Sequence, residues 1–297
     1  MMDLGRLRAL HAVAVHGSVG GAAASLGFTP SAVSQQIAKL ERETRTVLLE
    51  RQGRGVVLTD AALELAATAR QVLALVEQAE VTLEEQRGQA VGRLVLAAFA
   101  TGARGIVPGA LAELRERCPE LDVRLLEVDP YLATELVARG EVDLALVQDW
   151  PTVPLPIQDG LSRLDLGIDP VDLLVPAGHP LAELTVVPVG RLLGQRWISV
   201  PPGNICHDWL VRTLREAGEE PDVIYQVGEF ETQIALIDAG LGVGLVPRLG
   251  RAALPPGVVA RPVVPEPARR VFVLWRTRTS RRPAVAAALD ALRRQWS

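Results

Sequence analysis

The chain has 297 residues, of which 48% are hydrophobic and 22% are charged, and its formal net charge is −4. A chain of this length can form two or three domains that each bury a core, and the composition excludes a disordered polymer. The acidic balance argues against attraction to nucleic acid along the whole chain. Residues 1–60 nevertheless hold seven basic and five acidic residues, an excess with the right sign for a nucleic-acid partner at this end.

The sequence contains only two cysteines, Cys118 and Cys206, and they are far apart. This spacing predicts neither a disulfide framework nor a paired-cysteine metal site. It is typical of a protein in a reducing compartment. The N-terminus lacks the apolar core of a secretion signal, and no run of about 18 apolar residues follows it. We therefore expect a cytoplasmic chain with no membrane partner and no metal or other cofactor.

The segment between Ser18 and Ile37 meets the steric demands of a helix-turn-helix. Ser18 can cap a first short helix, and Gly27 can adopt the left-handed backbone that ends it. Thr29 then predicts the N-cap of a second helix, with Pro30 in its first turn. Because this start directs the first turn of the second helix outward, we expect that end to enter the major groove of DNA.

The second helix is predicted to have one apolar face and one polar face. Val33, Ile37 and Leu40 recur at helical spacing and should face the core. The residues that then face outward are polar: serine and glutamine side chains can read base edges, and a lysine can hold a phosphate. The DNA-contacting residues predicted for this motif are Ser18, Thr29, Pro30, Ser31, Ser34, Gln35 and Lys39.

Two short runs rich in β-forming residues follow, at 47–51 and 56–58, with the sequence QGRG between them. This pattern predicts a hairpin with a basic tip. Arg51 and Arg54 suit the DNA backbone or the minor groove beside the second helix, as in a wing. The alternative for residues 1–59 is a small Ala-rich bundle without a DNA role. The agreement of corner glycine, cap and basic tip favours a winged helix-turn-helix domain.

Residues 60–88 predict one long helix, because no glycine or proline occurs between Thr59 and Arg87. Its apolar positions alternate in steps of three and four, which favours pairing with a second helix and makes this segment a candidate dimerisation element. The alternative is a surface helix packed on its own domain, since alanine makes a shallow seam. The seam positions are Ala62, Leu65, Ala66, Ala69, Val72, Leu73, Val76, Ala79 and Leu83.

Residues 89–297 alternate between strand and helix patterns, which predicts an α/β domain with largely parallel sheets. The expected strands are 93–100, 122–128, 143–147, 196–200, 223–227 and 244–247, and the expected helices are 104–117, 131–139, 207–217 and 229–239. Pro-rich stretches at 151–156 and 255–267 suggest that the chain crosses between two lobes there. We expect lobe I to span about 91–160 and 268–297, and lobe II about 161–267.

Ligands of such α/β architectures bind beyond the carboxyl ends of the strands. By this rule the candidate effector-binding residues are Thr101, Gln148, Asp149, Ser199 and Glu229. The Thr101 hydroxyl can hold a small polar ligand, but it can equally serve only to cap the next helix. Because this set combines hydroxyl groups with the carboxylates of Asp149 and Glu229, it does not predict whether the effector is an anion or a cation.

The sequence also matches a known family. The matching residues are 7–14, 17–18, 22–23, 26–37, 40–41, 48, 50–51 and 58–59 near the N-terminus, then 119, 140–146, 179–181 and 239–243. Over essentially the whole chain these residues resemble the LysR-type transcriptional regulators. The resemblance implies a winged helix-turn-helix, a linker helix that dimerises and a two-lobed effector domain similar to periplasmic solute-binding proteins. The chain departs from the family at Arg45 and Ala62, where glycine is usual or common, and at Leu49, where phenylalanine is usual.

The leading hypothesis is a transcriptional regulator that binds promoter DNA as a homodimer or homotetramer and answers to a small-molecule effector. A solute-binding protein without a DNA role would leave the first 58 residues unexplained. An enzyme that uses Cys206 or His207 is disfavoured, because neighbours in a helix point away from each other and no metal spacing or catalytic triad stands out. We expect no catalytic activity.

Overall fold

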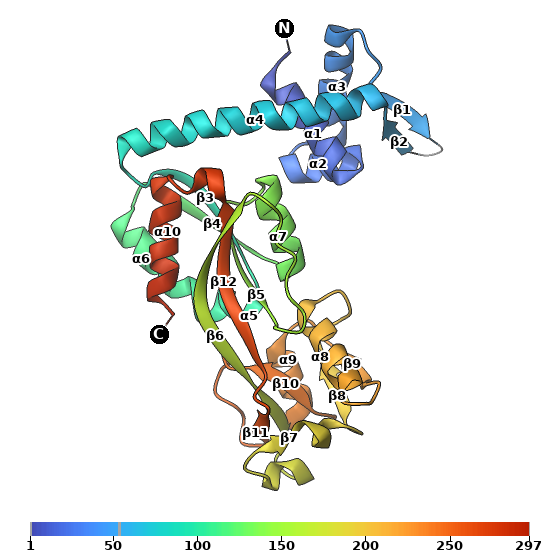
Figure 1. Ribbon diagram of the computed structural model, residues 1–297, viewed down its shortest axis with the longest axis vertical. Coiled ribbons are helices and arrows are strands. Elements are labelled where there is room, and N and C mark those ends of the chain that lie inside the picture. The colour runs from blue at the N-terminus through green and yellow to red at the C-terminus, as the bar shows by residue number, and fades with distance from the viewer. Residues whose placement is uncertain (1, 53–54, 297) are drawn as a thin grey trace. The chain divides into compact units, whose positions relative to one another are not determined.

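The computed structural model describes residues 2–52 and 55–296 and divides the chain into two compact units, residues 1–86 and 87–297. The first unit contains the elements α1 (Leu4–His16), α2 (Val19–Leu26), α3 (Pro30–Thr44), β1 (Leu49–Gln52), β2 (Gly55–Leu58) and α4 (Asp60–Arg87) (Figure 1). Strands β1 and β2 pair antiparallel as a hairpin. Among the described residues no single helix is long and apolar enough to cross a membrane; only α1 and α2 together reach that apolar length, and they are bent by 120°.

The core of the first unit joins its four helices. Ile37 and Leu40 of α3 are fully buried beside Leu10 of α1, in the packing that the apolar face of α3 predicts. Three predicted seam positions of α4, namely Ala62, Ala66 and Ala69, belong to the same core. The first half of the predicted seam therefore packs on its own unit, which corrects our expectation that the whole seam faces a second helix.

The second unit is built on a mixed sheet with the strand order β4-β3-β5-β12-β6-β11-β7, and β10 also pairs with β6. These strands are β3 (Gly92–Ala98), β4 (Leu121–Glu127), β5 (Leu144–Asp149), β6 (Leu161–Pro176), β7 (Val187–Pro188), β10 (Gly244–Pro247), β11 (Val258–Val264) and β12 (Ala268–Arg276). A separate parallel pair is formed by β8 (Arg196–Ser199) and β9 (Asp222–Gln226). The expectation of largely parallel sheets is wrong in part, because β12 runs antiparallel to both β5 and β6, and β10 and β11 run antiparallel to β6.

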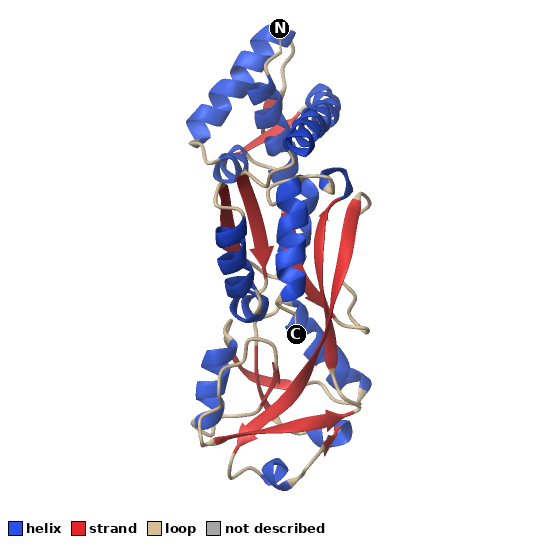
Figure 2. Ribbon diagram, turned by 90° about the vertical axis from the view of Figure 1, so that its left-hand side faces the viewer, coloured by secondary structure: helices blue, strands red, loops and turns tan. Residues whose placement is uncertain are grey.

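Helices cover both faces of the sheet in the first lobe. Along β5, Leu144 and Leu146 belong to the core under α6 (Val107–Arg117) and α10 (Pro283–Arg294), whereas Ala145 and Val147 belong to the core under α7 (Pro130–Arg139), as the strand period of two requires. Figures 1 and 2 show α6 and α10 side by side. The helices of this unit are α5 (Ala100–Gly105), α6 (Val107–Arg117), α7 (Pro130–Arg139), α8 (Ile205–Glu216), α9 (Phe230–Asp238) and α10 (Pro283–Arg294), with short 3₁₀ turns at Pro180–Glu183, Val189–Leu192 and Thr277–Thr279.

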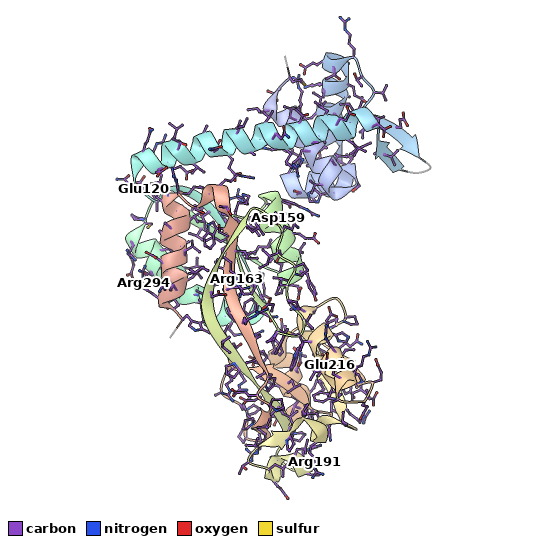
Figure 3. All side chains as sticks on the ribbon, viewed as in Figure 1. Glu120, Asp159, Arg163, Arg191, Glu216 and Arg294 are labelled. Atoms are coloured by element: carbon purple, nitrogen blue, oxygen red, sulfur yellow. The ribbon has the colours of Figure 1, made fainter. Side chains whose placement is uncertain are left out.

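An ion pair fixes one of these contacts on the outside of the lobe. Arg294 of α10, labelled in Figure 3, donates from Nε to a carboxylate oxygen of Glu113 on α6 at 2.8 Å. The Glu113 carboxylate also accepts from Arg117 of its own helix at 2.7 Å, and these two hydrogen bonds hold the pKa of Glu113 below its usual range. Because this ion pair is exposed, it adds little to the free energy of unfolding and mainly orients α10 on α6.

Strands β6 and β12 connect the two lobes. Residues 161–170 of β6 run beside β12 in lobe I, with a register shift at Leu166, and its last six residues pair with β10 and β11 in lobe II. The first crossing therefore lies inside β6 near Asp169–Val171, and the prediction that it lies at 151–156 is wrong, because those residues form the loop after β5. The second crossing follows β11 at residues 265–267, at the end of the predicted Pro-rich stretch. Figure 1 shows both strands running along this unit.

Candidate functional site

The start of α3 has the geometry that its sequence predicts. Gly27 ends α2 with a φ of 68°, in the left-handed region that favours glycine. Thr29 is the N-cap of α3, and its Oγ1 accepts a hydrogen bond from the backbone N–H of Ala32 at 3.2 Å. Ser18 caps α2 in the same way, its Oγ accepting from the N–H of Gly21 at 3.0 Å. These caps fix the angle at which α3 leaves the turn.

One face of α3 is open to solvent and polar. Val33, Ile37 and Leu40 are fully buried, whereas the outward positions are exposed, as the helical spacing predicts. The exposed polar residues of this face are Ser31, Ser34, Gln35 and Lys39. Their donors and acceptors are therefore presented along one side of a helix whose N-terminus carries a partial positive charge.

Side-chain contacts hold the hairpin against α3. Glu41 of α3 accepts hydrogen bonds from the backbone N–H groups of Leu48 and Leu49 at 2.8 and 3.1 Å. The hydroxyl of Thr59 donates to the carbonyl of Val47 at 2.9 Å and ties the end of the hairpin to its beginning. Of the two predicted wing arginines, Arg51 lies on β1 opposite Val56, and Arg54 falls outside the described residues.

Arg45 follows α3 with a φ of 52°, and no other non-glycine among the described residues has a positive φ. In this region the Cβ atom crowds the following carbonyl, at a cost of about 1 kcal/mol for a residue other than glycine. The position is one where the family that this sequence resembles usually has glycine. The departure therefore falls on a strained backbone.

The second unit holds a cavity of about 190 Å³ between its two lobes. Lobe I contributes the segments that follow β3 and β4 and the end of β5, lobe II contributes the N-terminal ends of α8 and α9, and Arg269 of β12 completes the lining. Two of the five predicted effector residues, Thr101 and Gln148, line this cavity. Ser199 lines a smaller cavity of about 20 Å³ that shares Cys206 with the larger one. Asp149 and Glu229 line neither cavity.

Thr101 does not cap a helix, which corrects one of its two predicted roles. The helix that the sequence places at 104–117 is preceded by the separate short helix α5, whose N-cap is Phe99. Thr101 therefore lies inside α5, is buried, and accepts a hydrogen bond from the guanidinium of Arg269. The same guanidinium donates from Nε to Asp169 at 2.8 Å and lies 4.9 Å from the centre of the Phe99 ring.

The carboxylate of Asp149 has a structural role. Its carboxylate receives two hydrogen bonds from Arg270, both of 2.7 Å, and a third from the backbone N–H of Leu155 at 3.1 Å. The residue is buried at the end of β5, and it faces away from the neighbouring Gln148 because side chains alternate along a strand. Glu229 is the exposed N-cap residue of α9, and its side chain makes no capping hydrogen bond.

Several side-chain contacts join the lobes beside the cavity, and one of them is an ion pair between Arg104 of α5 and Glu231 of α9. The Tyr131 hydroxyl of α7 donates to Asp208 of α8 at 2.9 Å. The Gln148 amide donates to the Sγ of Cys206 at 3.4 Å. Trp150, which follows β5, stacks on Trp209 of α8 with ring centres 3.8 Å apart and planes inclined by 7°.

Sequence reasoning missed four polar residues of the cavity: Glu127, Asp129, Asn204 and Arg269. Asp129 and Asn204 are both helix N-caps. An aspartate or asparagine directly before a predicted helix is the sequence signal that could have identified both. Arg269 is 168 residues from Thr101 in the sequence, and no local pattern connects the two. Burial of the Asp129 carboxyl raises its pKa above the usual range, and burial of the thiol raises the pKa of Cys206.

Residues 87–297 match the family model described as the LysR substrate binding domain, and residues 4–63 match that of the bacterial regulatory helix-turn-helix protein, lysR family. The chain is 30% identical over 295 residues to the probable HTH-type transcriptional regulator LrrA of Synechococcus elongatus, covering 98% of this chain and 97% of that protein. The chain belongs to the LysR family of transcriptional regulators.

Other LysR-type regulators are similar along the full length. The DNA-binding transcriptional dual regulator OxyR of Escherichia coli is 28% identical, over 98% of this chain and 95% of that protein. A full-length OxyR variant from Pseudomonas aeruginosa has the same fold, with a TM-score of 0.71 at 24% identity over 99% of this chain and 98% of that chain. HinK from the same organism gives 0.60 at 19% identity, over 100% and 99% of the two chains.

Membership of the family assigns a function to each unit. The N-terminal helix-turn-helix is a DNA-binding domain, and the two-lobed α/β unit is an effector-binding domain of a transcriptional regulator. The leading hypothesis from the sequence is thereby confirmed in its fold class and its general function.

Proposed function

We propose that α3 reads DNA sequence in the major groove through Ser31, Ser34 and Gln35, and that Lys39 holds a backbone phosphate. The exposed polar face of α3 carries this proposal, because its opposite face is fully buried and only this side can meet a partner. Ser18, Thr29 and Pro30 act at the helix starts, where backbone N–H groups can meet phosphates. Arg51 and Arg54 contact the backbone or the minor groove.

The experiment compares specific and random DNA. Ser34→Ala and Gln35→Ala should each lose about 1–3 kcal/mol of preference for the operator, because each removes a base contact. Arg51→Ala should weaken binding to both DNAs alike and reduce the salt dependence. Gln71→Ala, an exposed glutamine on α4, is the matched control and should change neither. Equal losses on operator and random DNA for Gln35→Ala would contradict the base-reading role.

The regulator acts as a homodimer, and two dimers form the homotetramer. Residues 1–59 are the DNA-binding domain, 60–88 the dimerisation helix and 89–297 the effector domain. The exposed apolar residues Leu75 and Leu83 of α4, at 66% and 55% of their accessible surface, support pairing through this helix. Leu75→Glu should shift the mass in sedimentation velocity from dimer or tetramer to smaller species. Arg70→Glu, at an exposed position on the opposite side of the same helix, is the control.

The small-molecule effector binds in the cavity between the lobes, with Thr101 and Gln148 among its contacts. The cavity lies against the contacts that join the lobes, so a ligand there can change how the lobes are set. A compound that changes promoter binding should lose its thermal shift in Gln148→Leu. Glu229→Gln, whose carboxylate lies outside the cavity lining, should keep it.

The chain works in the cytoplasm, where its DNA is, and has no catalytic activity. Cys206 and His207 engage different partners, the thiol accepting from Gln148 and the ring Nδ1 lying 3.0 Å from the carbonyl of Val200. The raised pKa of Cys206 disfavours a thiolate nucleophile. Any turnover of a candidate substrate that disappears in Cys206→Ser or His207→Gln would overturn this part of the proposal.

A further inference from the structure

Two buried oxygen atoms of the inter-lobe cavity have no hydrogen-bond partner among the described residues, Asp129 Oδ2 and Gln148 Oε1. Gln148 is only 1% exposed, and its amide nitrogen is engaged by Cys206. Asp129 uses its other oxygen, Oδ1, to accept from the backbone N–H of Tyr131 at 2.9 Å. Both residues line the cavity, so a group that enters it can meet both oxygens.

The positive charge of the cavity is already neutralised. Arg269 is fully buried, and its guanidinium forms an ion pair with Asp169, also buried, while a second nitrogen is engaged by Thr101. A carboxylate ligand would have to compete with Asp169 for this guanidinium. The remaining carboxylates of the lining, Asp129 and the exposed Glu127, give the cavity a net negative charge.

Two of the helix starts at the cavity are also occupied by the chain itself. Asp129 caps α7, and Asn204 caps α8 by accepting from the N–H of Cys206 at 2.9 Å. Helix N-termini attract anions through such N–H groups. Here α7 and α8 already have an oxygen partner from the protein, whereas α5 and α9 have no side-chain cap. An anionic ligand therefore finds N–H groups at the starts of α7 and α8 already engaged.

We propose that the effector is a small amine-bearing cation whose ammonium group donates hydrogen bonds to Asp129 and Gln148. This inference rests on the proposed function of the cavity as the effector site. An ammonium supplies both the charge and the donors that two unpartnered buried acceptors require, whereas a carboxylate supplies neither. Burial raises the pKa of Asp129 even though the backbone N–H groups of Tyr131 and Ile205 act in the opposite direction, as expected for a carboxyl group without a countercharge. A bound cation would lower this pKa again.

The test uses the full-length protein and size-matched probes. Thermal shift and titration calorimetry are measured with 1,4-diaminobutane and histamine, with butane-1,4-diol as the neutral match and succinate as the anionic match. We expect at least one amine to raise the Tm and to bind at millimolar or lower concentration. The diol and succinate should do neither, because the cavity discriminates by charge and donors rather than by size.

Two variants locate the contact. Asp129→Asn keeps an oxygen for the α7 cap but removes the charge, and it should weaken the amine by about 10–100-fold. Gln148→Leu should weaken it by about 10-fold. Asp122→Asn, an exposed carboxylate of β4 paired with Arg124 at 2.9 Å, makes the same change in charge outside the cavity and should have no effect. If Asp129→Asn fails to fold, Gln148→Leu decides alone.

The outcomes separate this inference from the proposed function. If succinate binds and Asp129→Asn strengthens its binding, the effector is anionic and only the amine class is overturned. If no amine binds to the wild-type protein, the amine class is overturned as well. If a compound changes promoter binding but its affinity is the same in Asp129→Asn and Gln148→Leu, the effector site lies elsewhere and the proposed function fails with the inference.

Discussion

The two units of this regulator encode their sites in different ways. In the DNA-binding unit, the corner, the cap and the exposed face of α3 lie within about twenty consecutive residues, so that local rules position this helix. In the effector unit, the cavity draws single side chains from segments as distant as Thr101 and Arg269, which are 168 residues apart. A local interface tolerates changes elsewhere in the chain, whereas a cavity of this kind depends on long-range ion pairs.

The largest expected effect tests that dependence. Arg269→Met should lower the free energy of unfolding of the effector unit by about 3–5 kcal/mol, because it leaves the buried Asp169 carboxylate without its countercharge. All five tryptophans lie beyond residue 149, so urea denaturation followed by tryptophan fluorescence reports on this unit alone.

Arg212→Met is the control for Arg269→Met. It breaks the exposed pair with Glu216, whose side chains are both 55% exposed, and should cost well under about 1 kcal/mol. Equal losses of unfolding free energy in the two variants would show that burial does not make the Arg269–Asp169 pair more important for stability. The contrast between the two units would then not hold.

In the DNA-binding unit Glu41 ties the hairpin to α3, and removing this contact gives the next largest effect. Glu41→Ala should cost about 2 kcal/mol, because two backbone N–H groups of the hairpin lose a charged acceptor. Glu41→Gln keeps an oxygen acceptor and should lose about half as much. Far-UV circular dichroism during thermal unfolding measures both, and DNA affinity should fall in the same order. An unchanged Tm in both variants would mean that the hairpin is held by other contacts.

A smaller effect is expected where the lobes meet. Tyr131→Phe removes the hydrogen bond to Asp208 and should cost about 1 kcal/mol, since the tyrosine ring keeps its packing. Tyr225→Phe, a tyrosine of β9, is the matched control. If the bond also limits lobe movement, the fluorescence of the stacked pair Trp150 and Trp209 should change in Tyr131→Phe and not in the control.

The contrast between the units also explains what the sequence could predict. Thr29-Pro30 and Gly27 announce a helix start and a corner by their chemistry alone, and the structure has both where they were expected. The same reasoning fails for β6, where Pro170 stands within an unbroken strand and the crossing between lobes needs no loop. Sequence rules also predicted Asp149 rather than Asp129 as a cavity residue. Only the fold reveals that Arg270 neutralises Asp149 and that no described cation pairs with Asp129.

The smallest effect concerns Arg45 and has the opposite sign. Arg45→Gly should raise the stability of the DNA-binding unit by about 0.5 kcal/mol, because relief of the left-handed backbone at φ 52° exceeds the added flexibility of glycine in the unfolded chain. Arg45→Ala keeps the Cβ atom and should not stabilise, so the pair separates backbone strain from loss of the charge. Thermal unfolding by circular dichroism measures both. If Arg45 instead contacts the DNA backbone, both variants should bind operator and random DNA more weakly, by the same factor for each DNA. The strained backbone at Arg45 would then serve to place a positive charge beside the wing.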